Sequence, residues 1–287
     1  MKSLRQILEN AGAKKIAVGH FNFSDLAALK AIFEAARELN LPVMVGVSEG
    51  EREFVGVRQA AALVRSLREE YDYPIYLNAD HTHSLEKVTE AAMAGFDEIL
   101  FDGSKLPFTE NVKQTREAVK IVKAINPNVI VEGEIGYIGS SSEVMKEKPE
   151  GIELTTPEEA LRFVKETGID VLAPAVGNMH GLLESMVKGD VKKRLDIERI
   201  MKIKEAVTIP LTLHGGSGTN DDDFVEAIRS GITIVHINTE IRLAWRRGIE
   251  EGLAKNPNEV APYKILPSAI EAIKRIVQER LKLFSYK

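Results

Sequence analysis

Three histidines each follow an apolar, strand-like run and stand where that strand would end: His81 in IYLNADH, His180 in VLAPAVGNMH and His214 in IPLTLH. Imidazoles delivered from separate strand ends can converge on one tetrahedral cation and leave its fourth position open, as a catalytic zinc site requires. The chain contains no cysteine, so metal binding would fall to His, Asp and Glu side chains. The pattern predicts an enzyme with a metal ion.

Three acidic residues also lie at predicted strand ends. Asp80 directly precedes His81, where it could act as a general acid or base near the metal or could orient an imidazole. Asp102, in ILFDGS, could cap the turn that follows it or, like Glu134 in VEGEIG, contribute to a second metal position. These carboxylates favour acid–base chemistry beside the cation.

The other histidines divide into two kinds. His20 and His236 also fall at or near predicted strand ends, and this shared placement favours a cluster at one end of the fold. His83 instead precedes a helix predicted to begin at Ser84, and we expect a solvated side chain in its first turn.

A glycine-rich turn, Gly215–Gly218, follows His214 at once and precedes a helix predicted to begin near Asp221. Backbone N–H groups in such a turn can bind an anion, and the loops after the last two strands of a barrel recur as phosphate sites. The last strand ends in His236-Ile237-Asn238-Thr239, whose polar side chains could face the same region. The sequence therefore favours a phosphate site here.

Short β-rich runs alternate with amphipathic helical stretches along the whole chain, and most of the runs are continuously apolar, as parallel strands covered on both faces are. Eight strands close a (β/α)8 TIM barrel, and 287 residues suffice for one such domain over 1–287 with extra C-terminal helices from Asn258 onward. The eight runs are Lys15–Val18, Val43–Val47, Ile75–Asn78, Glu98–Phe101, Val129–Glu134, Val171–Val176, Pro210–His214 and Ile232–Ile237.

Two connections are unusually long, Gly136–Thr156 and Gly177–Asp196, and both would leave the end of the barrel where active-site loops belong. Thr156-Pro157-Glu158-Glu159 has the residues of a helix start. The long connections are therefore expected to carry site residues.

Overall charge and composition exclude some partners. A formal net charge of −5 and a pI near 5.8 argue against nucleic acid or an anionic membrane as a partner and leave room for a local phosphate site. No apolar window is long enough to span a membrane, and the N-terminus lacks the apolar core of a signal peptide. We expect a cytoplasmic protein.

Five segments resemble, in order, the motifs of the class II, metal-dependent fructose-bisphosphate and tagatose-bisphosphate aldolases. They are NADH at 78–81, LFDGS at 100–104, VEGEIG at 131–136, VGNMHG at 176–181 and LHGGSG at 213–218. The resemblance implies a reversible carbon–carbon lyase of glycolysis and gluconeogenesis that cleaves a ketose 1,6-bisphosphate, through a metal-stabilised enediolate, to dihydroxyacetone phosphate and glyceraldehyde 3-phosphate.

The resemblance also implies residue roles. His81, His180 and His214 would bind the catalytic zinc, and Asp102 and Glu134 would hold a second or displaced metal, with room for a second divalent or a monovalent cation. Asp80 would be the catalytic acid. The residues implied to bind substrate are Asn22, Ser48, Gly181, Gly215, Gly216, Ser217 and Thr239. A homodimer or homotetramer is expected from the same resemblance.

Three departures from the family pattern concern the substrate more than the metal. His236 in VHINT stands where the family has Asn, so the substrate contact is altered or shared with Asn238. In the mobile loop that carries the family's C1 proton abstractor, Ser142 stands at the matching place, and Glu143 beside it becomes the candidate base. A family lysine is replaced by Glu184, which leaves Lys188 as a substitute.

Other hypotheses remain at this stage. Fructose bisphosphate is favoured over tagatose bisphosphate or another ketose phosphate. A metal-dependent barrel hydrolase or sugar epimerase is suggested by His81-Thr82-His83, but such a pair belongs at the first strand of hydrolase barrels and here follows the third. A non-catalytic binding barrel predicts that the histidines do not converge.

Overall fold

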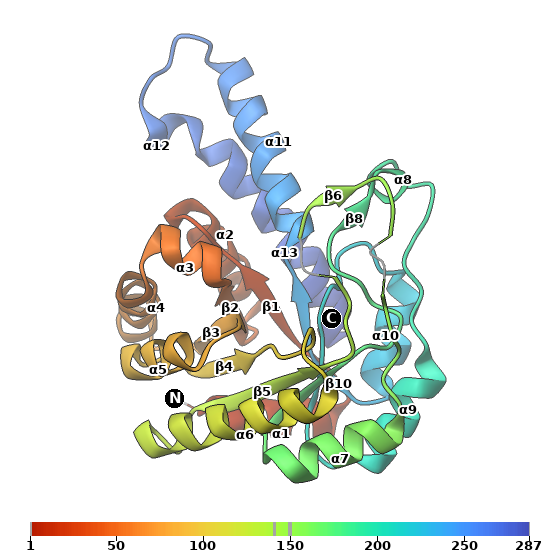
Figure 1. Cartoon of the computed structure of the whole chain (residues 1–287). Coiled ribbons are helices and arrows are strands. Elements are labelled where there is room, and N and C mark those ends of the chain that lie inside the picture. Colours follow the sequence, from red (N-terminus) through yellow and green to blue (C-terminus); the bar gives the residue numbers. More distant parts are fainter. Residues whose placement is uncertain (1, 140–141, 149–150, 287) are drawn as a thin grey trace.

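Eight parallel strands close into a barrel surrounded by helices in a computed structural model that describes residues 2–139, 142–148 and 151–286 (Figure 1). Around the barrel the strands follow the order β1-β10-β9-β7-β5-β4-β3-β2. Their bounds are β1 Val18–Asn22, β2 Val43–Val47, β3 Ile75–Thr82, β4 Glu98–Phe101, β5 Ile130–Ile135, β7 Val171–Pro174, β9 Leu211–Leu213 and β10 Ile232–Ile237. The predicted TIM barrel is confirmed.

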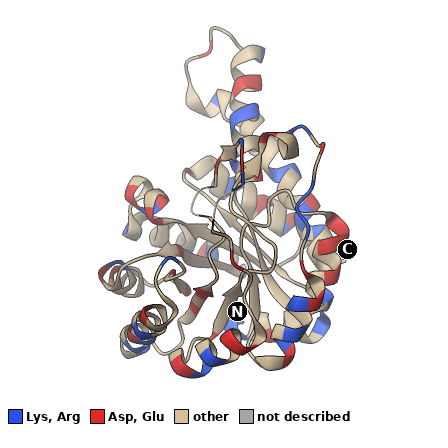
Figure 2. Cartoon of the chain, turned by 45° about the vertical axis from the view of Figure 1, so that its right-hand side comes forward, with Lys and Arg blue, Asp and Glu red and all other residues tan. Residues whose placement is uncertain are grey.

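Helices surround the barrel, and most of the Lys, Arg, Asp and Glu residues lie on them (Figure 2). The helices are α1 Leu4–Lys14, α2 Leu26–Leu39, α3 Glu49–Val55, α4 Val57–Tyr71, α5 Leu85–Ala94, α6 Phe108–Ile125, α7 Pro157–Thr167, α8 Glu184–Val187, α9 Ile197–Ala206, α10 Asp221–Arg229, α11 Thr239–Lys255, α12 Pro262–Ile265 and α13 Pro267–Ser285. None of the described helices is long and apolar enough to cross a membrane.

The predicted start of the α7 helix is confirmed. Thr156 accepts a hydrogen bond from the Glu159 backbone N–H, and the Glu159 carboxylate accepts one from the Thr156 N–H, which forms a capping box with Pro157 in the first turn. Local residue types thus fix where this helix begins.

The first predicted strand, Lys15–Val18, is wrong in position. Lys15 ends α1 with a left-handed backbone, φ 52°, and β1 begins only at Val18. The apolar residues Ile16 and Ala17 resemble a strand in the sequence, but the chain there turns from α1 into the barrel. The shift moves His20 and Asn22 from the end of the strand into it.

Helix α1 closes one end of the barrel. Its apolar side chains Leu4, Leu8 and Ala11 pack against the first inward-facing residues of the strands, which are Val18, Met44, Tyr76, Ile130, Val171 and Ile234. This apolar layer leaves the opposite end, where the strands finish, as the end that can hold a site.

Above that layer the barrel interior is polar. Register pairs His20 with His236 and Asn78 with Glu98, so these four buried side chains lie at one level. Glu132 and Thr212, also fully buried, lie close together across the barrel. Side chains two residues further along the strands therefore face the open end.

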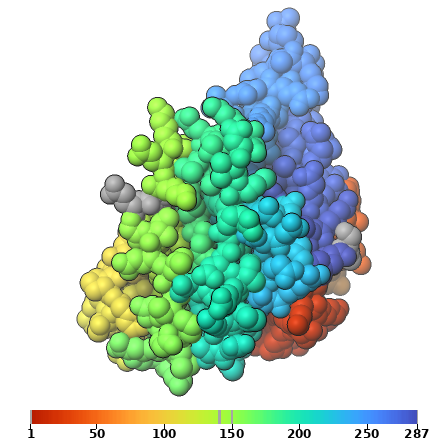
Figure 3. Space-filling view, turned by 90° about the vertical axis from the view of Figure 1, so that its right-hand side faces the viewer, coloured from red at the N-terminus to blue at the C-terminus, as the bar shows by residue number. Residues whose placement is uncertain are grey.

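The two long connections meet each other over that end. Their short strands β6 Val144–Met145 and β8 Leu182–Leu183 pair in parallel, an element that no sequence pattern predicted. The expected C-terminal helices are present, and α11 with α12 forms a narrow projection away from the barrel (Figure 3). Helix α13 returns to pack on α11 and α2.

Candidate active site

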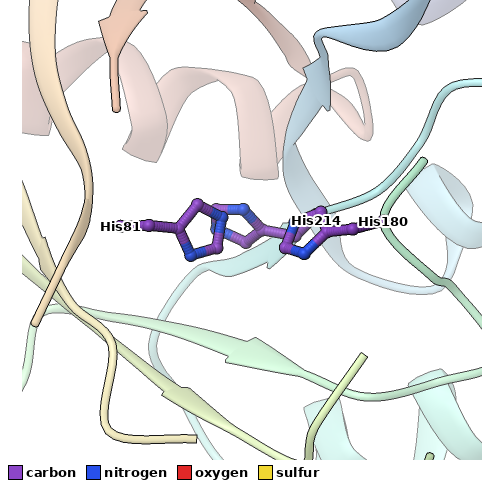
Figure 4. A group of neighbouring side chains, drawn as sticks. All are labelled: His81, His180 and His214. Carbon is purple, nitrogen blue, oxygen red and sulfur yellow. The ribbon is translucent and has the colours of Figure 1, made fainter. Parts of the chain in front are cut away.

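The three predicted ligand histidines converge. His81 at the end of β3, His180 in the loop after β7 and His214 directly after β9 point their rings toward one another (Figure 4), and one nitrogen of each lies within 4.8 Å of the others. Ring centroids are 4.6 Å apart for His81 and His180 and 4.8 Å apart for His81 and His214. These imidazoles could hold one metal ion.

An irregular backbone lets two consecutive residues of β3 face the site. Side chains of neighbouring strand residues normally point to opposite faces. His81, however, has a φ of 42°, and the pairing of β3 with β4 shifts register between Ala79 and Thr82. Asp80 and His81 therefore both lie beside the cavity. A left-handed backbone at a residue other than Gly costs about 1–3 kcal/mol and is often found at functional sites.

Each of the three histidines has one ring nitrogen beside an acceptor, and the other ring nitrogen could bind a metal. Nδ1 of His180 donates to the Gly139 carbonyl at 2.7 Å, and Nδ1 of His81 lies 2.8 Å from Asp102 Oδ2. Nε2 of His214 lies 2.6 Å from Glu132 Oε1. Such partners orient metal-binding imidazoles, so the donor set fits a divalent metal ion.

Burial keeps two of these rings neutral. It lowers the pKa of both His180 and His214 to about 3, and the charge of His81 adds to the effect. His81 behaves oppositely: burial lowers its pKa, but Asp80 and Asp102 outweigh that and raise it well above its usual value. In the metal-free protein the proton on His81 thus balances the surrounding carboxylates, and a cation would take over that charge.

The two carboxylate oxygens of Asp80 differ in their hydrogen bonding. Its Oδ2 accepts a hydrogen bond from Asn22 Nδ2 at 2.8 Å, while its buried Oδ1 has no hydrogen-bond partner among the described residues. That free oxygen lies 3.6 Å from His81 Nε2 and 4.0 Å from His214 Nδ1. Burial raises the pKa of Asp80, but His81 and His236 outweigh it and hold the pKa well below its usual range. The site thus contains an ionised carboxylate whose Oδ1 is not engaged in a hydrogen bond with the described residues.

Asp102 and Glu134 lie behind His81. Asp102 Oδ1 accepts hydrogen bonds from the Ser104 backbone N–H at 3.0 Å and from its hydroxyl at 2.6 Å, as the turn-cap alternative predicted, while its Oδ2 orients His81. Glu134 Oε2 lies 3.5 Å from His81 Nδ1 and has no hydrogen-bond partner in the part of the chain that the structure describes. The three residues form a second group that could hold a cation.

His83 is half-exposed, as expected, but it is not free. Its Nδ1 lies 3.1 Å from the Asp102 carbonyl, and its side chain lines the larger cavity described below. The strand irregularity at His81 separates the two histidines, so His83 is absent from each group that could hold a metal among the described residues.

His236 stacks on His20 inside the barrel, with ring centroids 3.5 Å apart and 8° between the ring planes. Gly46 makes room for this pair, because an added Cβ there would overlap the His20 ring. His236 Nδ1 lies 3.6 Å from Asp80 Oδ1, and within residues 2–139, 142–148 and 151–286 neither nitrogen of His236 has a hydrogen-bond partner. His236 therefore lies directly beside Oδ1 of Asp80 and limits the space there.

Several buried residues of the site were not predicted from the sequence. Glu132 supports His214, and burial raises its pKa to about 8. Glu51 accepts a hydrogen bond from Asn22 Nδ2 at 2.9 Å, and Arg52 donates to the Asp80 carbonyl at 3.2 Å. Glu132 lies two residues before Glu134 on one strand, which could have shown that both face inward. Nothing local in the sequence marks Glu51 and Arg52, which lie on a surface-type helix.

The site opens into a cavity of about 330 Å³, which is large enough for a small phosphorylated sugar. Its lining includes Asp80, His81, His180, Ser48, Asn238 and the candidate base Glu143. Arg242 of α11 also lines it, donating to Glu51 Oε1 at 2.8 Å and to the Ser142 carbonyl at 3.3 Å. Sequence reasoning did not predict this guanidinium.

Most of the residues predicted to bind phosphate and substrate line a second, narrower cavity that adjoins the first. Its lining includes Asn22, Gly181, Gly215, Ser217, His236 and Thr239. Gly216 is not on that wall, because its N–H donates to the His236 carbonyl at 3.1 Å. Gly215 has a φ of 60°, and a Cβ there would overlap the Met179 carbonyl. Tightly packed loops thus form this second cavity at the N-terminus of α11. The positive end of a helix favours binding of an anion there.

Two further predicted positions lie elsewhere. Glu184 begins α8 and Lys188 ends it, both are exposed, and neither lines the two cavities. The lysine that does reach these loops is Lys193, which is buried and was not singled out in the sequence.

The chain matches a model of the family described as fructose-bisphosphate aldolase class-II over residues 2–287. It is 36% identical over 285 residues to a fructose-bisphosphate aldolase of Geobacillus stearothermophilus, covering 98% of this chain and 96% of that protein. A fructose-bisphosphate aldolase of Thermus caldophilus is 34% identical over 300 residues, with 97% and 96% covered. The crystal structure of the YdjI aldolase of Escherichia coli K12 superimposes with a TM-score of 0.80 at 27% identity, over 99% of this chain and 96% of that one.

Proposed function

The chain belongs to the class II fructose-bisphosphate aldolase family, and on that premise we propose that it reversibly cleaves a ketose 1,6-bisphosphate to dihydroxyacetone phosphate and glyceraldehyde 3-phosphate with a zinc ion. Fructose 1,6-bisphosphate is the proposed substrate, because the curated relatives carry that name. One observation supports the proposal most: the three imidazoles converge beside Oδ1 of Asp80, and each keeps one ring nitrogen that its orienting partner does not use.

His81, His180 and His214 are the proposed zinc ligands. A zinc ion there would polarise the substrate carbonyl and stabilise negative charge on the neighbouring oxygens during bond cleavage. Asp102, Glu132 and Gly139 keep the three imidazoles in place. Asp102 and Glu134 are the proposed holders of a second cation.

Asp80 is the proposed catalytic acid and base. During cleavage its Oδ1 takes the proton of the C4 hydroxyl while the C3–C4 bond breaks, and during condensation it returns that proton to the aldehyde oxygen. Asn22 holds the Asp80 carboxylate in place by donating to its Oδ2, and Arg52 holds the backbone there by donating to the Asp80 carbonyl. The low pKa of Asp80 in the metal-free site supports this role, because the base must begin ionised.

Glu143 is the proposed group that moves the second proton. In the cleavage direction it delivers a proton to the carbon that becomes C1 of dihydroxyacetone phosphate, and in condensation it removes that proton. Its place on the wall of the cavity shared with Asp80 supports the assignment. Its exposure to solvent lets Glu143 exchange the proton with water between turnovers.

The proposed phosphate contacts are Gly181, Gly215, Ser217 and Thr239, at the N-terminus of α11, with Gly216 supporting them from behind. Asn22, Ser48, His236 and Asn238 are the proposed contacts of the remaining substrate. His236 is bulkier than an amide side chain, so it would narrow the space beside Asp80 and restrict which ketose fits.

The cytoplasm is the proposed location, and a homodimer or homotetramer is the proposed assembly. The assembly is supported by exposed apolar side chains on the projection formed by α11 and α12: Val260 is 87% exposed and Tyr263 is 75% exposed. Large exposed apolar side chains on a protruding element often mark a protein contact.

The decisive experiment measures cleavage of fructose 1,6-bisphosphate and tagatose 1,6-bisphosphate in parallel, with the unphosphorylated ketoses as controls and with zinc content determined by elemental analysis. We expect cleavage of a bisphosphate, loss of activity after treatment with a chelator, and recovery on adding zinc. Activity that survives complete removal of metal would contradict the zinc proposal. Faster cleavage of the tagatose epimer would keep the chemistry and correct the substrate.

A further inference from the structure

Lys193 lies in the long connection after β7. Its backbone N–H and its backbone carbonyl both form hydrogen bonds with the loop after β9. Its N–H donates to the Gly218 carbonyl at 2.9 Å, and its carbonyl accepts from the Asn220 N–H at 3.1 Å. Its side chain passes inward and is only 4% exposed. A buried lysine needs partners for its head group.

Three backbone carbonyls supply those partners. Nζ of Lys193 donates to Met179 O at 2.7 Å, to Gly181 O at 2.7 Å and to Gly215 O at 2.9 Å. Met179 and Gly181 flank the ligand His180, and Gly215 follows the ligand His214. One nitrogen thus joins the two loops that carry two of the three proposed metal ligands.

The contacts require a charged head group. A nitrogen that donates to three carbonyls must carry three hydrogens, which an ammonium has and a neutral amine lacks. Burial lowers the pKa of Lys193 to about 7, opposed by the charge of Glu240. The negative ends of the three carbonyl dipoles act in the same direction as Glu240, because they favour the charged form.

The surroundings differ from those of an ordinary buried ion pair. Among the described residues no carboxylate lies within 4 Å of Lys193 Nζ, whereas the half-buried Lys123 pairs with Asp170 at 2.6 Å. A ring of backbone carbonyls without a carboxylate is instead the environment in which proteins bind K⁺. Lys193 supplies the positive charge from its own side chain.

We propose that the Lys193 ammonium is a tethered monovalent cation, which holds the His180 and His214 loops at the separation that metal binding needs and makes a free monovalent cation unnecessary. Lys193 touches neither metal nor substrate and is therefore a positioning residue. The inference rests on the metal site of the proposed function.

Two substitutions separate charge from bulk. Lys193→Ala removes both and leaves the three carbonyls facing a space that a K⁺ or ammonium ion can enter. Lys193→Met fills the space without charge. Lys192→Ala is the matched control, because the neighbouring Lys192 is exposed.

Zinc affinity is measured for each protein by competition with a chelating dye, in potassium, ammonium or tetramethylammonium chloride at equal concentration. We expect wild type and Lys192→Ala to bind zinc equally in all three salts. In the tetramethylammonium salt, Lys193→Ala should bind zinc about 10–100-fold more weakly, the usual effect of losing a group that orients metal ligands. Potassium or ammonium should restore most of that loss in Lys193→Ala and none of it in Lys193→Met.

The melting temperature of the metal-free proteins, measured in the same salts, separates this inference from the metal proposal. Only Lys193→Ala should melt higher in potassium than in tetramethylammonium. Wild-type protein that binds no zinc in any salt would contradict the proposed metal site, while the melting temperatures would still test the tethered cation.

Three outcomes would overturn the inference: wild-type zinc affinity that depends on potassium, Lys193 variants that bind zinc as tightly as wild type, or a loss in Lys193→Ala that neither potassium nor ammonium restores. If Lys193→Ala does not fold, Lys193→Met decides: weakened zinc binding that salt does not restore supports the tethered cation, and wild-type affinity refutes it.

Discussion

The rings of His20 and His236 stack almost in parallel, with their centroids 3.5 Å apart, and Nδ1 of His236 lies 3.6 Å from Oδ1 of Asp80. Two stacked imidazoles can both be uncharged, and burial favours this, lowering the pKa of His20 to about 4 and that of His236 well below its usual value. The stack is therefore a neutral, rigid support, and its position depends on the absence of a side chain at Gly46.

Replacing Gly46 by Ala should disturb this support. The new methyl group would overlap the His20 ring, and overpacking of a buried site typically costs about 1–3 kcal/mol. We expect a lower free energy of unfolding in urea and a lower kcat, because His20 would push His236 toward Asp80. Gly12→Ala in α1 is the control: a Cβ there meets nothing within 4 Å, so its unfolding free energy should be unchanged or slightly higher. Equal effects of both substitutions would show that the room at Gly46 is unimportant.

Replacing Asp80 by Asn should separate chemistry from metal binding. The amide retains the shape of the side chain but cannot take a proton, so kcat for bisphosphate cleavage should fall by about 10²–10⁴. Zinc content should remain that of the wild type, because the three imidazoles keep their own orienting partners. Loss of zinc in step with activity would make Asp80 a structural support instead.

Replacing Glu143 by Gln tests the second proton transfer. The expected result is a large loss of hydrogen exchange at C1 of dihydroxyacetone phosphate in deuterated water, followed by NMR, because the amide that replaces Glu143 on the cavity wall cannot remove the proton. Glu147→Gln is the control, since Glu147 is an exposed residue of the same loop that does not line the cavity. Exchange at the wild-type rate in Glu143→Gln would direct the search to another base.

Asp170 predicts a pH-dependent stability away from the site. Its carboxylate accepts from Arg5 at 2.7 Å, from Lys123 at 2.6 Å and from the Val131 N–H at 2.9 Å. Burial raises the pKa of Asp170, but these partners outweigh it and lower the pKa below its usual value. A lowered pKa means that the stabilisation is present above the unfolded value, near 3.8, and is lost as pH falls through the folded value.

Asp170→Asn should therefore lower the free energy of unfolding by about 1.5–3 kcal/mol near neutral pH, with little difference from wild type once the wild-type carboxyl is protonated in acid. The measurement is urea unfolding at a series of pH values, with Asp190→Asn at an exposed position as control. A difference that is constant with pH would show that the charge of Asp170 does not stabilise the fold.

Much of the barrel could be predicted because each buried parallel strand leaves a continuous apolar run. The strand β1 was misplaced because Ile16 and Ala17 are apolar for a different reason, the turn out of α1, and only the left-handed backbone at Lys15 shows where the helix ends. The pairing of β6 with β8 could not be predicted, since it joins two loops distant in sequence through two residues each.

The site divides in the same way. His81, His214 and Asp80 could be found because each stands at or directly after the end of a strand, a position that the sequence reveals, and His180 because it follows β7 in one of the long connections. The alternation along β5 could have placed Glu132 inside the barrel beside Glu134, but not its contact with His214. Lys193 could not be found, because it stands in a run of basic residues that resembles an exposed loop, and only the folded loops surround its head group with carbonyls.

The three converging imidazoles come from distant parts of the chain, at positions 81, 180 and 214, and β3, which carries the first, is separated in the barrel from β9, after which the last follows. During biosynthesis no stretch emerging early from the ribosome holds a complete set. A site with all three imidazoles could hold a metal only after most of the polypeptide has been made and the barrel has closed. Bound zinc would then report that an individual molecule had finished folding.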